Sequence, residues 1–200
     1  NLRQRMKERQ PSQREALRFG RAIAEALAEA HGAGVLHRDL KPANVLIPRD
    51  GRPRVVDFGL AETLHHEATG RAAYRGVSAE FSVADLRGEK PAPSGTPAYM
   101  SPELWKGGES TEATDIWALG LLLHELFTGT HPYRGDGAVA PLILRVCASE
   151  PVPLGRAIIQ APETLRRTIE ACLDKDPARR PRAETVALTL AELLERRPGD

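Results

Sequence analysis

The sequence predicts an α+β domain that is mainly α-helical and carries one small β-hairpin. Apolar residues recur at helical spacing in several segments that short turn-like stretches separate. Only residues 45–56 read as two short strands around a tight turn. The length of 200 residues is sufficient for one domain with a substantial core. We find no internal repeat and no low-complexity tract.

The first long helix is expected over residues 12–33. Ser12 and Glu15 have the spacing of a capping box at a helix start, and Gly32 and Gly34 are typical of a helix end. The apolar residues between them keep helical spacing: Ala16, Phe19, Ile23, Leu27 and Ala30. The basic stretch before this helix, NLRQRMKERQ, is expected to be a solvated segment and not a binding patch.

A small hairpin is expected next, with strands over Val45–Ile47 and Arg54–Val56 and a turn around Asp50-Gly51. Pro48 and Pro53 restrict both strands to short lengths, because proline cannot donate a backbone hydrogen bond.

Residues 60–97 then lack periodicity and are rich in Gly, Pro, Ser, Thr and charged residues. A loop of this length inside a compact domain is usually functional or mobile. Residues 114–129, TDIWALGLLLHELFTG, are apolar nearly all round, which predicts a central buried helix ended by Gly129. Further helices are expected around residues 137–148, 162–173 and 182–196.

Composition excludes several classes of protein. The formal net charge is +1, with acidic and basic residues interspersed, so no nucleic acid or anionic membrane is expected as a partner. Cys147 and Cys172 have neither paired nor metal-ligand spacing, which favours a reducing, cytoplasmic setting. The longest apolar run, residues 116–123, is too short to cross a bilayer, and no signal peptide opens the chain. Because the first residue is Asn1 and not Met, we expect the chain to be cut from a longer protein.

The isolated aromatic and histidine side chains have ordinary structural interpretations. Trp105 and Trp117 are expected in the core. Four histidines show no pattern of metal ligation and are expected at the surface or in turns: His65, His66, His124 and His131.

The stretch GVLHRDLKPANVLI, residues 34–47, places charged and amide side chains inside an apolar sequence. Asp39 precedes the first strand and Asp57 follows the second, so antiparallel pairing brings both carboxylates and Asn44 together. Three oxygen donors suit Mg²⁺, and Lys41 adds a positive charge for a phosphoryl group. The pattern therefore indicates metal-assisted phosphoryl transfer.

Five motifs in order resemble the large, C-terminal lobe of a eukaryotic-type (Hanks-type) serine/threonine protein kinase: HRDLKPAN, DFG, GTPAYMSPE, DIWALG and DPARRP. The resemblance implies a protein-kinase-like fold without its N-terminal small lobe in this chain. The implied divisions are a hinge-side remnant (1–11), a helix E-like segment (12–33), a catalytic loop with a metal-binding turn (34–59), an activation segment (57–103) and a helical subdomain (111–197).

The resemblance also implies the roles of the charged residues. Asp39 would orient the attacking hydroxyl as the catalytic base, and Lys41 would steady the γ-phosphate of ATP. Asn44 and Asp57 would hold Mg²⁺, or Mn²⁺, against the nucleotide phosphates. Leu46 would form the floor under the adenine.

Other residues would support or regulate the site. Thr96 resembles a threonine that seats the substrate hydroxyl, and His37 and Phe58 resemble members of a stacked spine. Arg38 is typical of kinases controlled by phosphorylation of the activation segment. The candidate phosphate acceptors are Thr69, Ser78, Ser82 and Ser94.

Three residues have implied structural roles. Glu103 and Arg180 resemble the buried ion pair between the activation segment and the last helices. Asp115, in the expected central helix, resembles the residue that anchors the backbone of the catalytic loop.

The activity that follows is transfer of the γ-phosphate of ATP to serine or threonine hydroxyls of a protein substrate, with self-association for trans-phosphorylation. No Gly-rich loop, strand lysine or partner glutamate precedes the catalytic loop, so the chain by itself is expected to be inactive. One alternative is a non-catalytic kinase-like binding module, either a stand-alone lobe or a pseudokinase. Another is a small-molecule phosphotransferase of kinase-like fold, against which GTPAYMSPE argues.

Overall fold

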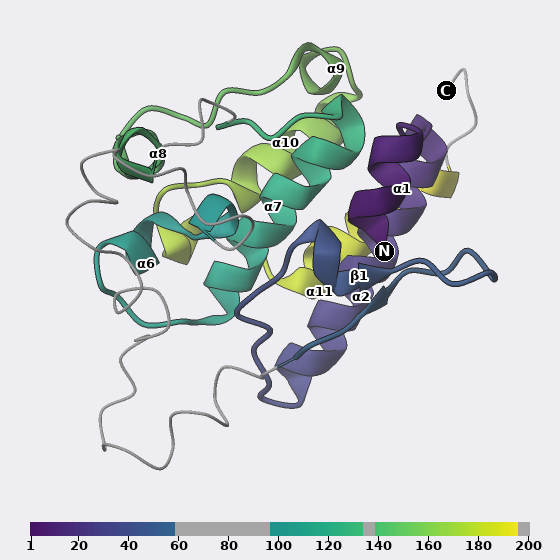
Figure 1. Cartoon of the computed structure of the whole chain (residues 1–200), viewed down its shortest axis with the longest axis horizontal. Coiled ribbons are helices and arrows are strands. Elements are labelled where there is room, and N and C mark those ends of the chain that lie inside the picture. Colours follow the sequence, from purple (N-terminus) through teal and green to yellow (C-terminus); the bar gives the residue numbers. More distant parts are fainter. Residues whose placement is uncertain (59–96, 134–138, 196–200) are drawn as a thin grey trace.

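The computed structural model describes residues 1–58, 97–133 and 139–195 (Figure 1). Its α-helices are α1 (Leu2–Glu8), α2 (Gln13–Gly32), α6 (Pro102–Trp105), α7 (Glu112–Thr128), α8 (Val139–Cys147), α9 (Arg156–Ile159), α10 (Glu163–Cys172) and α11 (Ala183–Glu195). Short 3₁₀ helices lie at η1 (Pro42–Asn44), η2 (Pro97–Tyr99) and η3 (Pro177–Arg179). Strands β1 (Val45–Leu46) and β2 (Arg54–Val55) form one small sheet. The expected α+β fold class, mainly helical with one hairpin, is confirmed.

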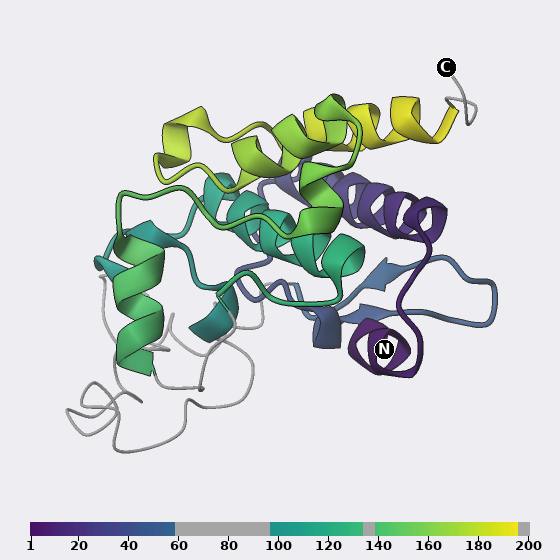
Figure 2. The ribbon, with the colours of Figure 1, turned by 90° about the horizontal axis from the view of Figure 1, so that it is seen from above.

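Helix α7 is the centre of the core. It is buried nearly all round; α2 and α10 pack against it, and α11 packs against α2 and α10. Figures 1 and 2 show α1 and the hairpin at one end of this bundle and α6 and α8 at the other. The capping box of Ser12 and Glu15 starts α2, and Gly129, with a φ of +73°, ends α7. Both helix ends lie where the sequence predicts them.

The hairpin is shorter than predicted. Val45 pairs with Val55 and Leu46 with Arg54 in antiparallel register, and the remaining arms are not in the ladder. Pro48 and Pro53 explain this, because neither can donate to a ladder hydrogen bond. Even this short sheet brings the residues before β1 and after β2 side by side.

The first residues were expected to be a solvated segment, and this prediction is wrong. They form α1, which begins with a capping box between Asn1 and Gln4 and buries Leu2 completely. Arg5 and Arg9 reach Glu15 of α2 at 3.4 and 2.7 Å, so the basic side chains also tie the two helices together. One fully buried leucine and these ion pairs make α1 part of the fold.

The expectation for His124 is also wrong. His124 is buried in α7, where its Nδ1 lies 2.9 Å from the Thr130 carbonyl and its Nε2 accepts from the Gly155 amide at 3.1 Å. It therefore joins α7 to the start of α9. His131 is partly buried, and His65 and His66 lie outside the described residues. Trp117 is fully buried and Trp105 packs against the core, as predicted.

The helices predicted around 137–148, 162–173 and 182–196 are present as α8, α10 and α11. The short helices α6 and α9 were not predicted, because a single turn carries no periodicity. No helix in the described ranges combines the length and apolar character needed to cross a membrane.

Gly120 allows the close approach of α7 and α10. A Cβ atom at this position would lie 2.8 Å from Cys172 Cβ and 2.9 Å from Leu173 Cδ2. We expect Gly120→Ala to lower the free energy of unfolding by about 1–3 kcal/mol through overpacking. Gly32→Ala is the control, because nothing lies within 4 Å of its Cβ position. Urea denaturation would measure both, and equal stability of the two variants would contradict the close approach.

Candidate active site

Asp115 organises the loop of residues 37–44. Its carboxylate accepts backbone hydrogen bonds from His37 and Arg38, both at 2.8 Å, and is almost fully buried. The same carboxylate lies 2.9 Å from Nε2 of His31, near the end of α2. Arg38 itself has a φ of +67°, a conformation that residues other than glycine rarely adopt. Asp115 therefore fixes the loop backbone from the central helix, as the resemblance implies, and the sequence did not single out His31.

His37 connects this loop to the segment after β2. Its Nδ1 accepts from the Asp39 amide at 3.2 Å, so Nε2 carries the proton and donates to the Val56 carbonyl at 3.0 Å. Burial lowers the pKa of His37, against the opposing charge of Asp115, so the ring stays neutral. Its centroid lies 4.7 Å from that of Phe58. The two rings are in contact with an interplanar angle of 57°, and their role as a spine pair stays a prediction.

Asp39, Lys41 and Asn44 form one hydrogen-bonded group. Lys41 Nζ lies 2.6 Å from Asp39 Oδ2, and Asn44 Nδ2 donates to both the carbonyl and Oδ2 of Asp39 at 3.0 Å. Asp39 remains partly open to solvent, whereas Asn44 is buried. The Asp39 carboxylate is therefore accessible to solvent and is held in place by the ammonium group of Lys41 and the amide of Asn44.

Asp57 lies beside this group because the Val56 amide donates to the Asn44 carbonyl at 3.0 Å. Asp57 is exposed and has a φ of +65°. The amide nitrogen of Asn44 is used by Asp39, so its oxygen Oδ1 faces elsewhere and can serve as a ligand. A carboxylate and an amide oxygen are the donors that Mg²⁺ and Mn²⁺ prefer, and the residues present fit such an ion. Leu46, on β1, keeps 43% of its surface exposed.

Glu103 and Arg180 form a bidentate ion pair, with nitrogen–oxygen distances of 2.6 and 2.8 Å. Arg180 also donates to the carbonyls of Ala113 and Asp174 and lies 5.1 Å above the Trp117 ring. Burial raises the pKa of Glu103, but the hydrogen bonds and charge of Arg180 outweigh this and lower it. The pair holds α6, where the candidate activation segment ends, against α7 and η3.

A second clamp on the same region was missed by the sequence analysis. The Tyr99 hydroxyl of η2 donates to Glu125 Oε2 of α7 at 2.6 Å. His131 packs edge-on against Tyr99 at 5.4 Å, and its Nδ1 accepts from the Tyr133 amide at 3.2 Å. These contacts fix η2, the turn that follows Thr96. Only the position of Tyr99 within GTPAYMSPE could have suggested them.

Several candidates lie outside the described residues. They are Thr96 and the candidate phosphate acceptors Thr69, Ser78, Ser82 and Ser94. Of the expected activation segment, the structure describes only the two ends, residues 57–58 and 97–103.

The helical bundle, the loop anchored by Asp115 and the Glu103–Arg180 pair define a protein-kinase-like large lobe. Comparison with known families agrees: the model of the protein kinase domain matches residues 1–189. The chain belongs to the protein kinase domain family, and the resemblance to eukaryotic-type serine/threonine kinases is confirmed. Protein kinases as a family use ATP and a divalent metal.

Curated relatives include serine/threonine-protein kinase PkaA of Streptomyces coelicolor, 39% identical over 86% of this chain and 28% of its own length. Serine/threonine-protein kinase pkn3 of Myxococcus xanthus is 36% identical over 80% of this chain and 27% of its own length. The probable serine/threonine-protein kinase PkwA of Thermomonospora curvata is 34% identical over all of this chain and 23% of its own length. The chain thus spans about a quarter of the length of these relatives.

We expect Asp115→Asn to release the loop, because an amide cannot accept from both sides and would place its NH₂ group against a backbone donor. The free energy of unfolding should fall by roughly 2–4 kcal/mol. The amides of His37 and Arg38 should lose protection from hydrogen exchange. Glu112→Gln, an exposed change in the first turn of the same helix, should leave those amides protected. Continued protection in Asp115→Asn would contradict the anchoring role.

Burial lowers the pKa of His131 from 6.5 to about 4. Between pH 6.5 and about 4, His131 is therefore protonated in the unfolded chain but not in the folded chain. The stability contributed by neutral His131 is complete above pH 6.5 and is lost as the pH falls toward 4, by roughly 3 kcal/mol in total.

His131→Asn should flatten this dependence, because the asparagine oxygen can still accept from the Tyr133 amide but does not titrate. Urea unfolding over a pH series would show a shallower slope between those two pH values than in the unaltered chain. Parallel profiles would show that His131 titrates normally in the folded protein.

Proposed function

We propose that this chain supplies the catalytic loop and metal-binding turn of a serine/threonine protein kinase, which transfers the γ-phosphate of ATP to serine or threonine hydroxyls of proteins. The observation that carries the proposal is the group of Asp39, Lys41 and Asn44, held at 2.6–3.0 Å in a loop that Asp115 anchors. Support for the substrate class comes from the names of the relatives and from the motifs DLKPAN and GTPAY.

In this mechanism Asp39 orients the substrate hydroxyl. Lys41 and Asn44 engage its Oδ2, so Oδ1 is the oxygen directed at the incoming hydroxyl. The hydroxyl oxygen forms a bond to the γ-phosphorus while the bond from that phosphorus to the bridging β–γ oxygen breaks. The proton passes to Asp39 and ADP leaves. Lys41 offsets the negative charge that the phosphoryl oxygens carry in the transition state.

Asn44 and Asp57 would hold Mg²⁺ or Mn²⁺ through their side-chain oxygens. When bound, such an ion neutralises charge on the nucleotide phosphates. Leu46 offers an exposed apolar surface on β1 that suits the face of the adenine.

Other parts of the chain have proposed roles in the same reaction. Residues 1–11 would lie on the hinge side of the nucleotide, and Thr96 would seat the hydroxyl. Arg38 would pair with a phosphate on the activation segment, which self-association and trans-phosphorylation would introduce.

The test is Asp39→Asn in the intact protein, assayed by transfer of labelled phosphate from ATP to a protein substrate. We expect a loss of at least about 100-fold in turnover, because the amide cannot accept the hydroxyl proton. Asp176→Asn is the matched control: Asp176 is exposed and caps η3, and asparagine caps equally well. An unaltered protein that transfers no phosphate would overturn the proposal and favour a kinase-like binding module.

A further inference from the structure

The net charge of +1 conceals a separation of charge along the chain. Residues 1–54 contain twelve Lys and Arg against six Asp and Glu, a net charge of +6. Residues 55–200 contain sixteen Lys and Arg and twenty-one Asp and Glu, a net charge of −5. Asymmetry of this size is typical of a chain with a charged interaction surface.

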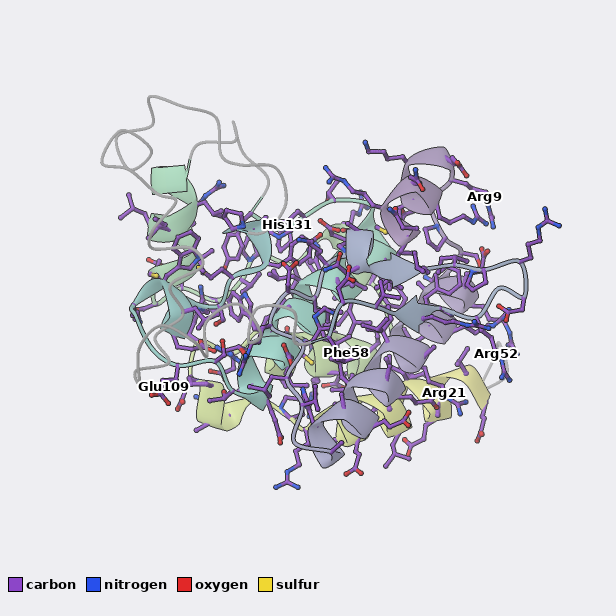
Figure 3. All side chains as sticks on the ribbon, turned by 60° about the horizontal axis from the view of Figure 1, so that its bottom comes forward. Arg9, Arg21, Arg52, Phe58, Glu109 and His131 are labelled. Carbon is purple, nitrogen blue, oxygen red and sulfur yellow. The ribbon has the colours of Figure 1, made fainter. Side chains whose placement is uncertain are left out.

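The positive charge is also separated in space. Residues 1–54 include α1, α2 and the hairpin, and α1, the start of α2 and the hairpin lie at the same end of the molecule in Figures 1 and 2. Figure 3 shows Arg9, Arg21 and Arg52 along one side and Glu109 on the opposite side. We call this surface the basic end and define it by Arg9, Arg14, Arg18, Arg21, Arg49, Arg52 and Arg54.

The hairpin turn presents two of these arginines in a fixed arrangement. The Gly51 amide donates to the Pro48 carbonyl at 3.0 Å, and the Arg52 amide donates to Asp50 Oδ1 at 2.9 Å. Gly51 has a φ of +72°, which a tight turn of this kind requires. Arg49 and Arg52 flank this turn and are exposed, so little backbone order has to be gained when they bind a partner.

Helix α2 contributes a second row. Arg14, Arg18 and Arg21 are four and three residues apart and therefore share one face of the helix. Arg21 is paired with Glu25 at 2.7 Å, whereas Arg14 and Arg18 are exposed and form no ion pair within the part of the chain that the structure describes. The same holds for Arg49 and Arg52. Four exposed guanidinium groups at one end thus remain available to an anion.

We propose that the basic end binds an acidic segment of a partner protein. Every member of this surface is an arginine, whose planar guanidinium binds carboxylates in a bidentate manner. Glu15, Glu25 and Asp50 already accept hydrogen bonds from Arg9, Arg21 and Arg54 at 2.7–3.0 Å, so guanidinium–carboxylate pairs form on this surface. This interaction surface is additional to the proposed phosphoryl transfer and does not depend on it.

The surface fits the other common anionic partners less well. A membrane-binding surface combines basic residues with several exposed apolar ones that insert. In α1, α2 and the hairpin, Leu46 of β1 is the exposed large apolar residue, and a single side chain does not form such an apolar surface. Single-stranded nucleic acid is bound through aromatic platforms, and none of the exposed large apolar side chains in the described residues is aromatic.

The test measures binding of a fluorescent peptide of about twelve residues, alternating Glu and Ser, to the intact protein by anisotropy at low and high salt. Phosphatidylserine-containing vesicles and a single-stranded oligonucleotide of similar length serve as competing probes. Reversing two charges, Arg49→Glu with Arg52→Glu, should weaken peptide binding about tenfold. Arg14→Glu with Arg18→Glu should weaken it similarly.

The control reverses the same number of charges elsewhere, with Lys106→Glu and Arg156→Glu, two exposed residues outside the basic end. It should change the affinity by less than about twofold. An equal loss of affinity in the control pair and the basic-end pairs, or no peptide binding in the unaltered protein, would overturn the proposal. Tighter binding of the vesicles or the oligonucleotide would also overturn it and identify the other partner. Phosphate transfer is measured in parallel, so failure of the binding proposal is separate from failure of the proposed function.

Discussion

The carboxylate of Asp115 accepts hydrogen bonds from two successive backbone amides of the loop of residues 37–44 and from a histidine ring of α2. A buried carboxylate is tolerated only when its oxygens are engaged, because an unpaired charge in the interior costs several kcal/mol. The hydrogen bonds from the loop backbone therefore offset the cost of burying this carboxylate, and the carboxylate in turn fixes the loop. Each of the two depends on the other, and the positions of Asp39 and Asn44 follow from this anchor.

Helix α7 is the common support of every other part of the site. Besides Asp115 it provides the Ala113 carbonyl and the Trp117 ring that receive Arg180, and the Glu125 carboxylate that receives Tyr99. The loop of residues 37–44, α6 and η2 are thus all fixed to one helix that is buried nearly all round. A rigid, fully packed helix holds polar partners more accurately than a surface loop does, which is why apolar packing and site geometry are inseparable here.

Short sequence motifs predicted those parts of the fold that depend on interactions between residues close together in the chain. The capping box at Ser12 starts α2 and the left-handed Gly129 ends α7 where the sequence indicates, because caps depend on neighbours in the chain. Helix α1 was missed since one buried leucine among charged residues has no periodicity. The contacts of His31 and His124 were equally invisible, because their partners are brought together only by tertiary packing. For the site, motifs indicated which residues matter, whereas only the coordinates show that Lys41 and Asn44 share one oxygen of Asp39.

Two residues of the site hold backbone conformations that side chains rarely adopt. Arg38 and Asp57 have φ angles of +67° and +65°, each of which costs on the order of 1–3 kcal/mol. Asp115 stabilises the first and the bond from Val56 to Asn44 secures the segment next to the second. Packing and hydrogen bonds therefore stabilise the unfavourable backbone conformations of these residues before any ligand binds. Such preorganisation suits phosphoryl transfer, in which the protein acts mainly by positioning charges around the reacting phosphate.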